Sequence, residues 1–142
     1  MEKIKFLKKT YNIIDRNSGA ECVFFKVSNT EGIKIYYHEE RAINARKRQI
    51  KAYKYKIGPK VLSIVHPIKF NDMIKYGYKT QVAKVVTDDG FEYTPMGKKL
   101  VKKVKKIFGR KHYIPGETVR VHNTGYIRNR PVIIDFGGCS FE

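Results

Sequence analysis

The stretch that decides the fold runs from Cys22 to Ile57 and reads CVFFKVSNTEGIKIYYHEERAINARKRQIKAYKYKI. Its first seven residues, Cys22–Ser28, are rich in β-forming side chains, and Asn29–Gly32 has the composition of a turn. Ile33–His38 then alternates apolar and polar residues, as a half-buried strand does. The segment therefore predicts two antiparallel strands, the second of which ends at His38.

A change of period after His38 predicts a helix from His38 to Ile57. One set of apolar residues recurs every seven positions, and a second set fills an adjoining face of the same helix. The first set is Ile43, Ile50 and Ile57, and the second is Ala42, Ala45, Gln49, Ala52 and Tyr53. Gly58-Pro59 follows, which is the expected stop signal.

The flanking sequence extends this pattern on both sides. Upstream, a short strand is predicted at Tyr11–Asp15 and a turn at Arg16–Glu21, in which Gly19 is the only glycine. Downstream, the predicted elements are two strands, an amphipathic helix and a strand-rich tail: Lys60–Val65, Lys79–Val86, Gly97–Phe108, Thr118–His122, Tyr126-Ile127 and Pro131–Phe136. The order predicts an α+β fold in which a curved antiparallel sheet of about five strands packs on the first helix.

Composition sets the wider limits. The 142 residues suit one domain, residues 1–142, which we divide into a sheet and helix (1–87) and a helix plus hairpin (88–142). No run approaches the roughly 20 apolar residues of a membrane span, and the N-terminus lacks the apolar core of a signal peptide. Two cysteines, Cys22 and Cys139, are too few for a structural zinc site. We therefore expect a cytoplasmic protein that does not contact a membrane.

Charge is the unusual feature, since 30 Lys+Arg against 13 Asp+Glu gives a net charge of +17. A basic stripe on the helix Gly97–Phe108 and just after it contributes strongly: Lys98, Lys99, Lys102, Lys103, Lys105, Lys106, Arg110 and Lys111. Such a stripe can track a phosphate backbone, and it can equally be a solvated helix face. Nucleic acid and an acidic host protein are both open as partners.

The tail, residues 121–137, reads VHNTGYIRNRPVIIDFG. An Asn, a short hairpin and an apolar strand that ends in Asp-Phe-Gly follow one another there, and in this it resembles the protein-kinase superfamily. The resemblance implies that Asn123 and Asp135 are ligands of Mg²⁺ bound with ATP, a role suited to their hard oxygen donors. It extends from about Tyr11 to the end of the sequence and is most specific in this tail.

Three further residues acquire roles through the same resemblance. Lys34, in the strand before the helix, resembles the lysine that grips the α- and β-phosphates. Gln49 stands where a helix residue should hold that lysine, although kinases use a Glu, so no ion pair can form. Gly19 is the one glycine where kinases have a glycine-rich phosphate loop.

The sequence departs from kinases where a catalytic base is needed. Five residues before Asn123 stands Thr118 rather than an Asp, and Glu117 is one position away. His122 is the substitute base. The sequence given also continues only seven residues beyond Asp135, whereas kinases continue into a substrate-binding lobe.

These features lead to two principal hypotheses and a weaker third. The first is a minimal kinase-like protein, similar to small bacteriophage-encoded ones, that binds ATP and Mg²⁺ as either a slow phosphotransferase or a pseudokinase. It would act in the host cytoplasm. The second is a basic protein without catalysis that binds nucleic acid or an acidic host protein. The third is a small-molecule kinase of the aminoglycoside-phosphotransferase type.

Overall fold

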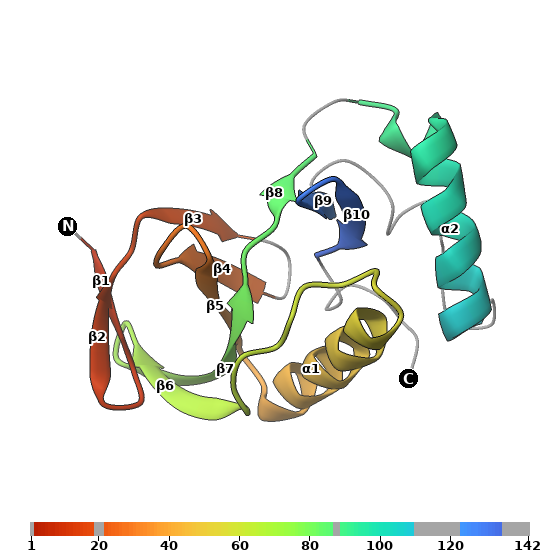
Figure 1. Cartoon of the computed structure of the whole chain (residues 1–142). Coiled ribbons are helices and arrows are strands. Elements are labelled where there is room, and N and C mark those ends of the chain that lie inside the picture. Colours follow the sequence, from red (N-terminus) through yellow and green to blue (C-terminus); the bar gives the residue numbers. More distant parts are fainter. Residues whose placement is uncertain (1, 19–21, 87–88, 110–122, 135–142) are drawn as a thin grey trace.

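A computed structural model describes residues 2–18, 22–86, 89–109 and 123–134. Figure 1 shows the chain arranged as a curved sheet with a helix beside it, followed by a smaller sheet and a second helix. The strands are β1 (Lys3–Phe6), β2 (Lys9–Asn12), β3 (Asp15–Ser18), β4 (Cys22–Lys26), β5 (Glu31–Tyr36), β6 (His66–Phe70), β7 (Met73–Gln81), β8 (Lys84–Val85), β9 (Thr124–Ile127) and β10 (Arg130–Ile133). The helices are α1 (Glu39–Lys54), the short 3-10 helix η1 (Phe91–Tyr93) and α2 (Pro95–Phe108).

The central sheet has five antiparallel strands in the order β3-β4-β5-β7-β6. The helix α1 follows β5 and packs against β5 and β7, the two inner strands that it touches most. This confirms the expected α+β class, with about five antiparallel strands packed on one helix. β8 pairs with β9, and β9 with β10, which makes a separate three-stranded sheet.

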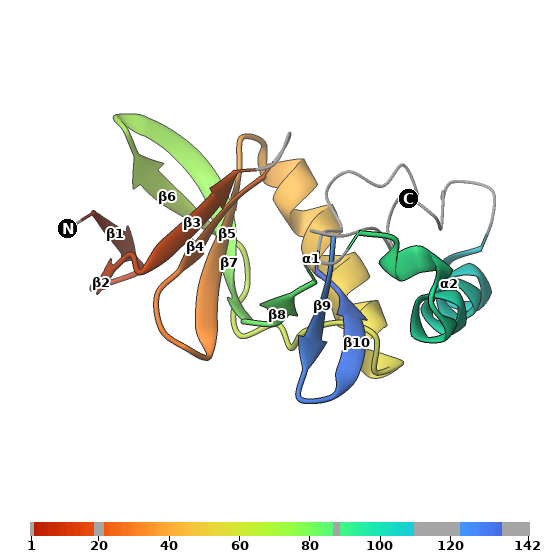
Figure 2. The ribbon, with the colours of Figure 1, turned by 90° about the horizontal axis from the view of Figure 1, so that it is seen from above.

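Opposite faces of the central sheet bury two different groups of side chains. One face carries Ile33, Ile35 and Phe25, and the β1–β2 hairpin covers it with Ile4 and Phe6. That hairpin was not predicted, because its four-residue strands are mostly exposed on their outer side. Figure 2, viewed from above, shows the hairpin at the end of the molecule opposite to α2.

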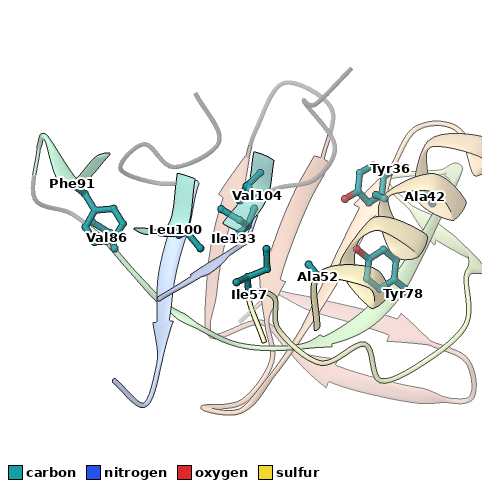
Figure 3. Packing of buried hydrophobic residues seen from close by; sticks show 11 residues of the cluster. Tyr36, Ala42, Ala52, Ile57, Tyr78, Val86, Phe91, Leu100, Val104 and Ile133 are labelled. Carbon is teal, nitrogen blue, oxygen red and sulfur yellow. The ribbon is translucent and has the colours of Figure 1, made fainter. Parts of the chain in front are cut away.

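The other face of the sheet joins the two halves of the chain. Tyr36 and Tyr78 from the sheet belong to the same buried cluster as Leu100 and Val104 of α2 and Ile133 of β10. Figure 3 shows these side chains in one continuous row, with Ile57 and Ala52 between the sheet and the second half. One apolar core therefore extends across the boundary that we drew at residue 87.

The buried face of α1 matches one of the two predicted patterns better than the other. Ala42, Ala45, Gln49 and Ala52 are buried, whereas Tyr53 of the same predicted set and Ile50 of the other set are each 42% exposed. Small alanines let the helix axis approach the sheet closely, and a row of isoleucines on that side would hold it away. The alanine face therefore directs the packing of α1, while Ile57 of the isoleucine repeat is buried beyond the end of the helix.

Several predicted strand limits were also wrong. β3 lies where a turn was predicted over Arg16–Glu21, and Lys60–Val65 contributes only a single bridge, between Val61 and Thr80. The two strands that complete the sheet beside β5 are instead β6 and β7. The turn between them consists of Asn71 and Asp72, which both have positive φ. Two such residues form a type I′ hairpin turn. The strand predicted at Thr118–His122 lies outside the described residues.

Candidate functional site

Lys34 lies at the centre of the sheet face that α1 covers. Its side chain is only 6% exposed, and its ammonium donates to Gln49 Oε1 over 3.2 Å and to the backbone oxygen of Ile134. Burial of an ammonium is costly unless it is hydrogen-bonded or paired, so the surrounding groups must hold it firmly. Three parts of the chain, β5, α1 and the end of β10, meet at this one cation.

Gln49 is fully buried, and all of its amide hydrogen-bonding groups are used. Its Oε1 accepts from Lys34 and from the hydroxyl of Tyr78 at 2.7 Å. Its Nε2 donates to Thr80 Oγ1 at 2.6 Å and to the backbone oxygen of Pro59 at 3.1 Å. Because Lys34 can only donate and the Pro59 oxygen can only accept, the network allows one orientation of the amide.

This network fixes α1 relative to the sheet as well as to Lys34. Tyr78 and Thr80 belong to β7, while Pro59 lies in the segment that follows the helix. A shift of α1 away from β5 would leave several buried polar groups without partners, at a cost of about 1–3 kcal/mol for each. The sequence pointed to the contact between Lys34 and Gln49 but not to Tyr78 or Thr80, which reach Gln49 only through strand pairing.

Asn123 lies next to the same point through the backbone. Its carbonyl oxygen accepts a 3.0 Å hydrogen bond from the amide of Ile134, the residue whose own oxygen binds Lys34. Two of the predicted site residues, Lys34 and Asn123, are thus both hydrogen-bonded to the backbone of Ile134. Asp135 is the next residue in the chain after Ile134.

The remaining predicted residues divide into two groups. Gly19, His122, Asp135, Arg110 and Lys111 lie outside the described residues. The six lysines of α2 lie on a helix that the structure does describe, and five of them are exposed while Lys105 is half-buried. Within the described ranges, no group of three or more His, Cys, Asp or Glu side chains could hold a metal ion.

Phe24 is a neighbour of Lys34 that the sequence analysis did not single out. It pairs directly with Lys34 across β4 and β5, so both side chains point to the same face of the sheet. Its ring also covers Gly32, where an added Cβ would collide with the ring. The glycine at this position therefore leaves room for a half-buried aromatic ring on the face of the sheet that carries Lys34.

An ion pair on the opposite face of the sheet, the face that the β1–β2 hairpin covers, joins β5 to β7. Lys79 of β7 lies 2.9 Å from Glu31 of β5. The hydrogen bond with Glu31, more than any other interaction, raises the pKa of Lys79 above its ordinary value. This charge is neutralised within the protein, so it is not a candidate for binding an anionic ligand.

Comparison with known proteins identifies no relative. The chain matches no protein-family model, no curated protein and no solved structure at the significance required. In the described part of the chain, neither helix is long and apolar enough to cross a membrane.

Proposed function

We propose that this protein is a kinase-like domain that binds ATP together with Mg²⁺. The observation that carries the proposal is the position of Lys34, a buried cation held by a helix residue and by the residue before Asp135. The α+β architecture, with five antiparallel strands and a helix after the third, agrees with the kinase-like sheet that the resemblance implies. The short backbone link between Lys34 and Asn123 adds to this support.

Each residue has a defined part in the proposed complex. Lys34 donates to oxygens of the α- and β-phosphates, and Gln49 holds the ammonium in place for them. Asn123 and Asp135 are the metal ligands, since an amide oxygen and a carboxylate are donors that suit Mg²⁺. The metal, when bound, supplies the positive charge that offsets the phosphates. The ring of Phe24 offers an apolar surface for the base.

Phosphoryl transfer by such a site would be slow. Thr118 occupies the position where the resemblance would place a catalytic Asp, and a hydroxyl cannot serve as a general base at neutral pH. Positioning and charge stabilisation supply most of the rate in phosphoryl transfer, so a low rate is still compatible with the site. We infer ATP binding as the primary property, with either slow transfer or none.

Thermal unfolding with ATP, in the presence and absence of Mg²⁺, tests the proposal. A ligand at 100 times its Kd stabilises the fold by about 2.7 kcal/mol, which corresponds to a midpoint rise of roughly 10 °C for a chain of this size. Asp135→Ala should abolish the Mg²⁺-dependent part of that rise. Asp89→Ala, which removes an exposed carboxylate elsewhere, should leave the rise intact. No rise in the wild type with ATP and Mg²⁺ would overturn the proposal.

A further inference from the structure

The lysine face of α2 is not used by the proposed nucleotide site. Leu100 and Val104 turn inward to the core, and the opposite side of the helix is almost entirely basic. Its exposed lysines are Lys98, Lys99, Lys102, Lys103 and Lys106. Among the described residues, no ion pair involves any of them.

The distribution of charge on α2 is unfavourable for a helix that merely faces solvent. No acidic residue occurs from Pro95 to Phe108, so the first turn has none to complement the helix dipole. Three like-charged pairs are spaced four residues apart: Lys98 with Lys102, Lys99 with Lys103 and Lys102 with Lys106. Each such pair costs about 0.2–0.5 kcal/mol.

The helix α1 provides an internal comparison. It is also rich in Lys and Arg, but it begins with Glu39 and Glu40 and has Lys51 and Lys54 in its last turn. Both placements complement the helix dipole; α2 shares the basic last turn, with Lys105 and Lys106, but has no acidic first turn. A general bias of this sequence toward lysine would affect both helices alike, so it does not explain why α2 alone lacks acidic residues.

The basic surface continues from α2 onto the end of α1. The ammonium of Lys51 lies 5.3 Å from the centre of the Phe108 ring, which joins the last turns of the two helices. Figure 1 shows the yellow C-terminal end of α1 beside the lower end of α2. Lys47 and Lys54 are exposed near Lys51 on α1.

We propose that this surface, the exposed lysines of α2 together with Lys47, Lys51 and Lys54 of α1, binds the phosphate backbone of nucleic acid without sequence preference. Protein interfaces depend on buried aromatic, Met or Arg anchors and are depleted in Lys. The large hydrophobic residues exposed on the two helices, Met96 on α2 and Ile50 and Tyr53 on α1, are outnumbered by the eight exposed lysines of the surface, which favours nucleic acid over an acidic protein as partner. Lysines alone are sufficient for phosphate contacts.

The dimensions of the surface agree with this partner. From Lys98 to Lys106 the helix rises about 12 Å at 1.5 Å per residue. Over that distance one strand of a duplex carries roughly three phosphates. Contact with several phosphates releases bound counterions, so binding must weaken steeply as salt increases.

The test is fluorescence anisotropy with a labelled 20-nucleotide single strand and with a 20-base-pair duplex, across 50–200 mM KCl. Replacement of Lys102, Lys103 and Lys106 by Gln should reduce the slope of log K against log salt by about two to three units, since each phosphate contact contributes about 0.7–0.9. The control replaces Lys3, Lys5 and Lys8 by Gln. These residues are exposed at the far end of the molecule, so the slope should not change.

Three results would overturn the proposal. The first is no binding of either nucleic acid at 50 mM KCl by wild-type protein that circular dichroism shows to be folded. The second is an equal loss of slope in both triple variants, which would indicate net charge rather than this surface. The third is displacement of the labelled strand by poly-glutamate as effectively as by unlabelled nucleic acid at matched charge, which would indicate an acidic protein partner.

Discussion

At the scale of single residues, Gln49 is the position where the proposed kinase-like site has an amide in place of a Glu. Gln49→Glu would place a carboxylate oxygen where Nε2 now donates to the Pro59 oxygen at 3.1 Å, so two acceptors would face each other. We expect the variant to lose about 1–3 kcal/mol of stability near pH 8. The ion pair with Lys34 favours the ionised carboxyl and burial favours the protonated one. At pH 5 the loss should be smaller, because the protonated carboxyl can donate to Pro59 again. Urea unfolding at the two pH values measures both.

Gln49→Met is the matched control for this substitution. It removes the hydrogen bonds without adding a titratable group, so its loss of stability should be the same at pH 5 and pH 8. The account of Gln49 fails if Gln49→Glu is as stable as the wild type at pH 8, because an amide would then not be required by Pro59.

The resemblance to kinases was sufficient to predict the Lys34–Gln49 contact but not the environment that enforces it. The resemblance implied a lysine in the strand before a helix and a partner for that lysine on the helix, and the two side chains are hydrogen-bonded. Tyr78 and Phe24 reach the same site through strand register, which periodicity along one strand cannot reveal. The requirement for an amide at position 49 depends on Pro59, whose carbonyl direction no sequence pattern encodes.

At the scale of secondary-structure elements, Gly97 in the first turn of α2 is a position where glycine should be more stable than alanine, the reverse of the usual order in a helix. Thr94 caps the helix by accepting from the amide of Gly97 at 3.0 Å. In a helix interior, Gly→Ala usually stabilises by roughly 0.5–1 kcal/mol. Here an added Cβ would collide with the backbone oxygen of Phe91, which cannot move as a flexible side chain could.

We therefore expect Gly97→Ala to destabilise the protein by about 1–3 kcal/mol, the range seen for overpacked sites. Thermal unfolding with circular dichroism measures this. The control is Lys99→Ala, an exposed position of the same helix, where the change should stay within about 0.5 kcal/mol. A Gly97→Ala variant more stable than the wild type would contradict the described junction of η1 and α2.

Among the elements, the sequence predicted α2 closely and the hairpins poorly. Leu100 and Val104 are buried at the spacing that indicated the helix. The β6–β7 hairpin escaped notice because its turn residues, Asn71 and Asp72, include no glycine. In the β1–β2 hairpin, Leu7 adopts a positive φ, a conformation that is unusual for leucine and has no signature in sequence.

At the scale of the whole molecule, the site depends on the contact between the two halves of the chain. The amide of Ile133, at the end of β10, donates to the oxygen of Ile57 after α1 at 2.8 Å. The same strand delivers Ile134 to Lys34. Because Leu100 and Ile57 belong to one buried cluster, the halves form a single core, and this core sets the position of the residue that precedes Asp135.

The central claim, that Lys34 binds nucleotide phosphates, is most directly tested by calorimetric titration of ATP with Mg²⁺ into wild-type protein and Lys34→Met. Methionine has a similar length and fills the buried space without charge. Loss of a charged hydrogen bond to phosphate, about 1.5–3 kcal/mol, predicts affinity weaker by roughly 10-fold to 150-fold. Adenosine, which lacks phosphates, should bind both proteins equally. Equal affinity of a folded Lys34→Met variant and the wild type for ATP would contradict the claim.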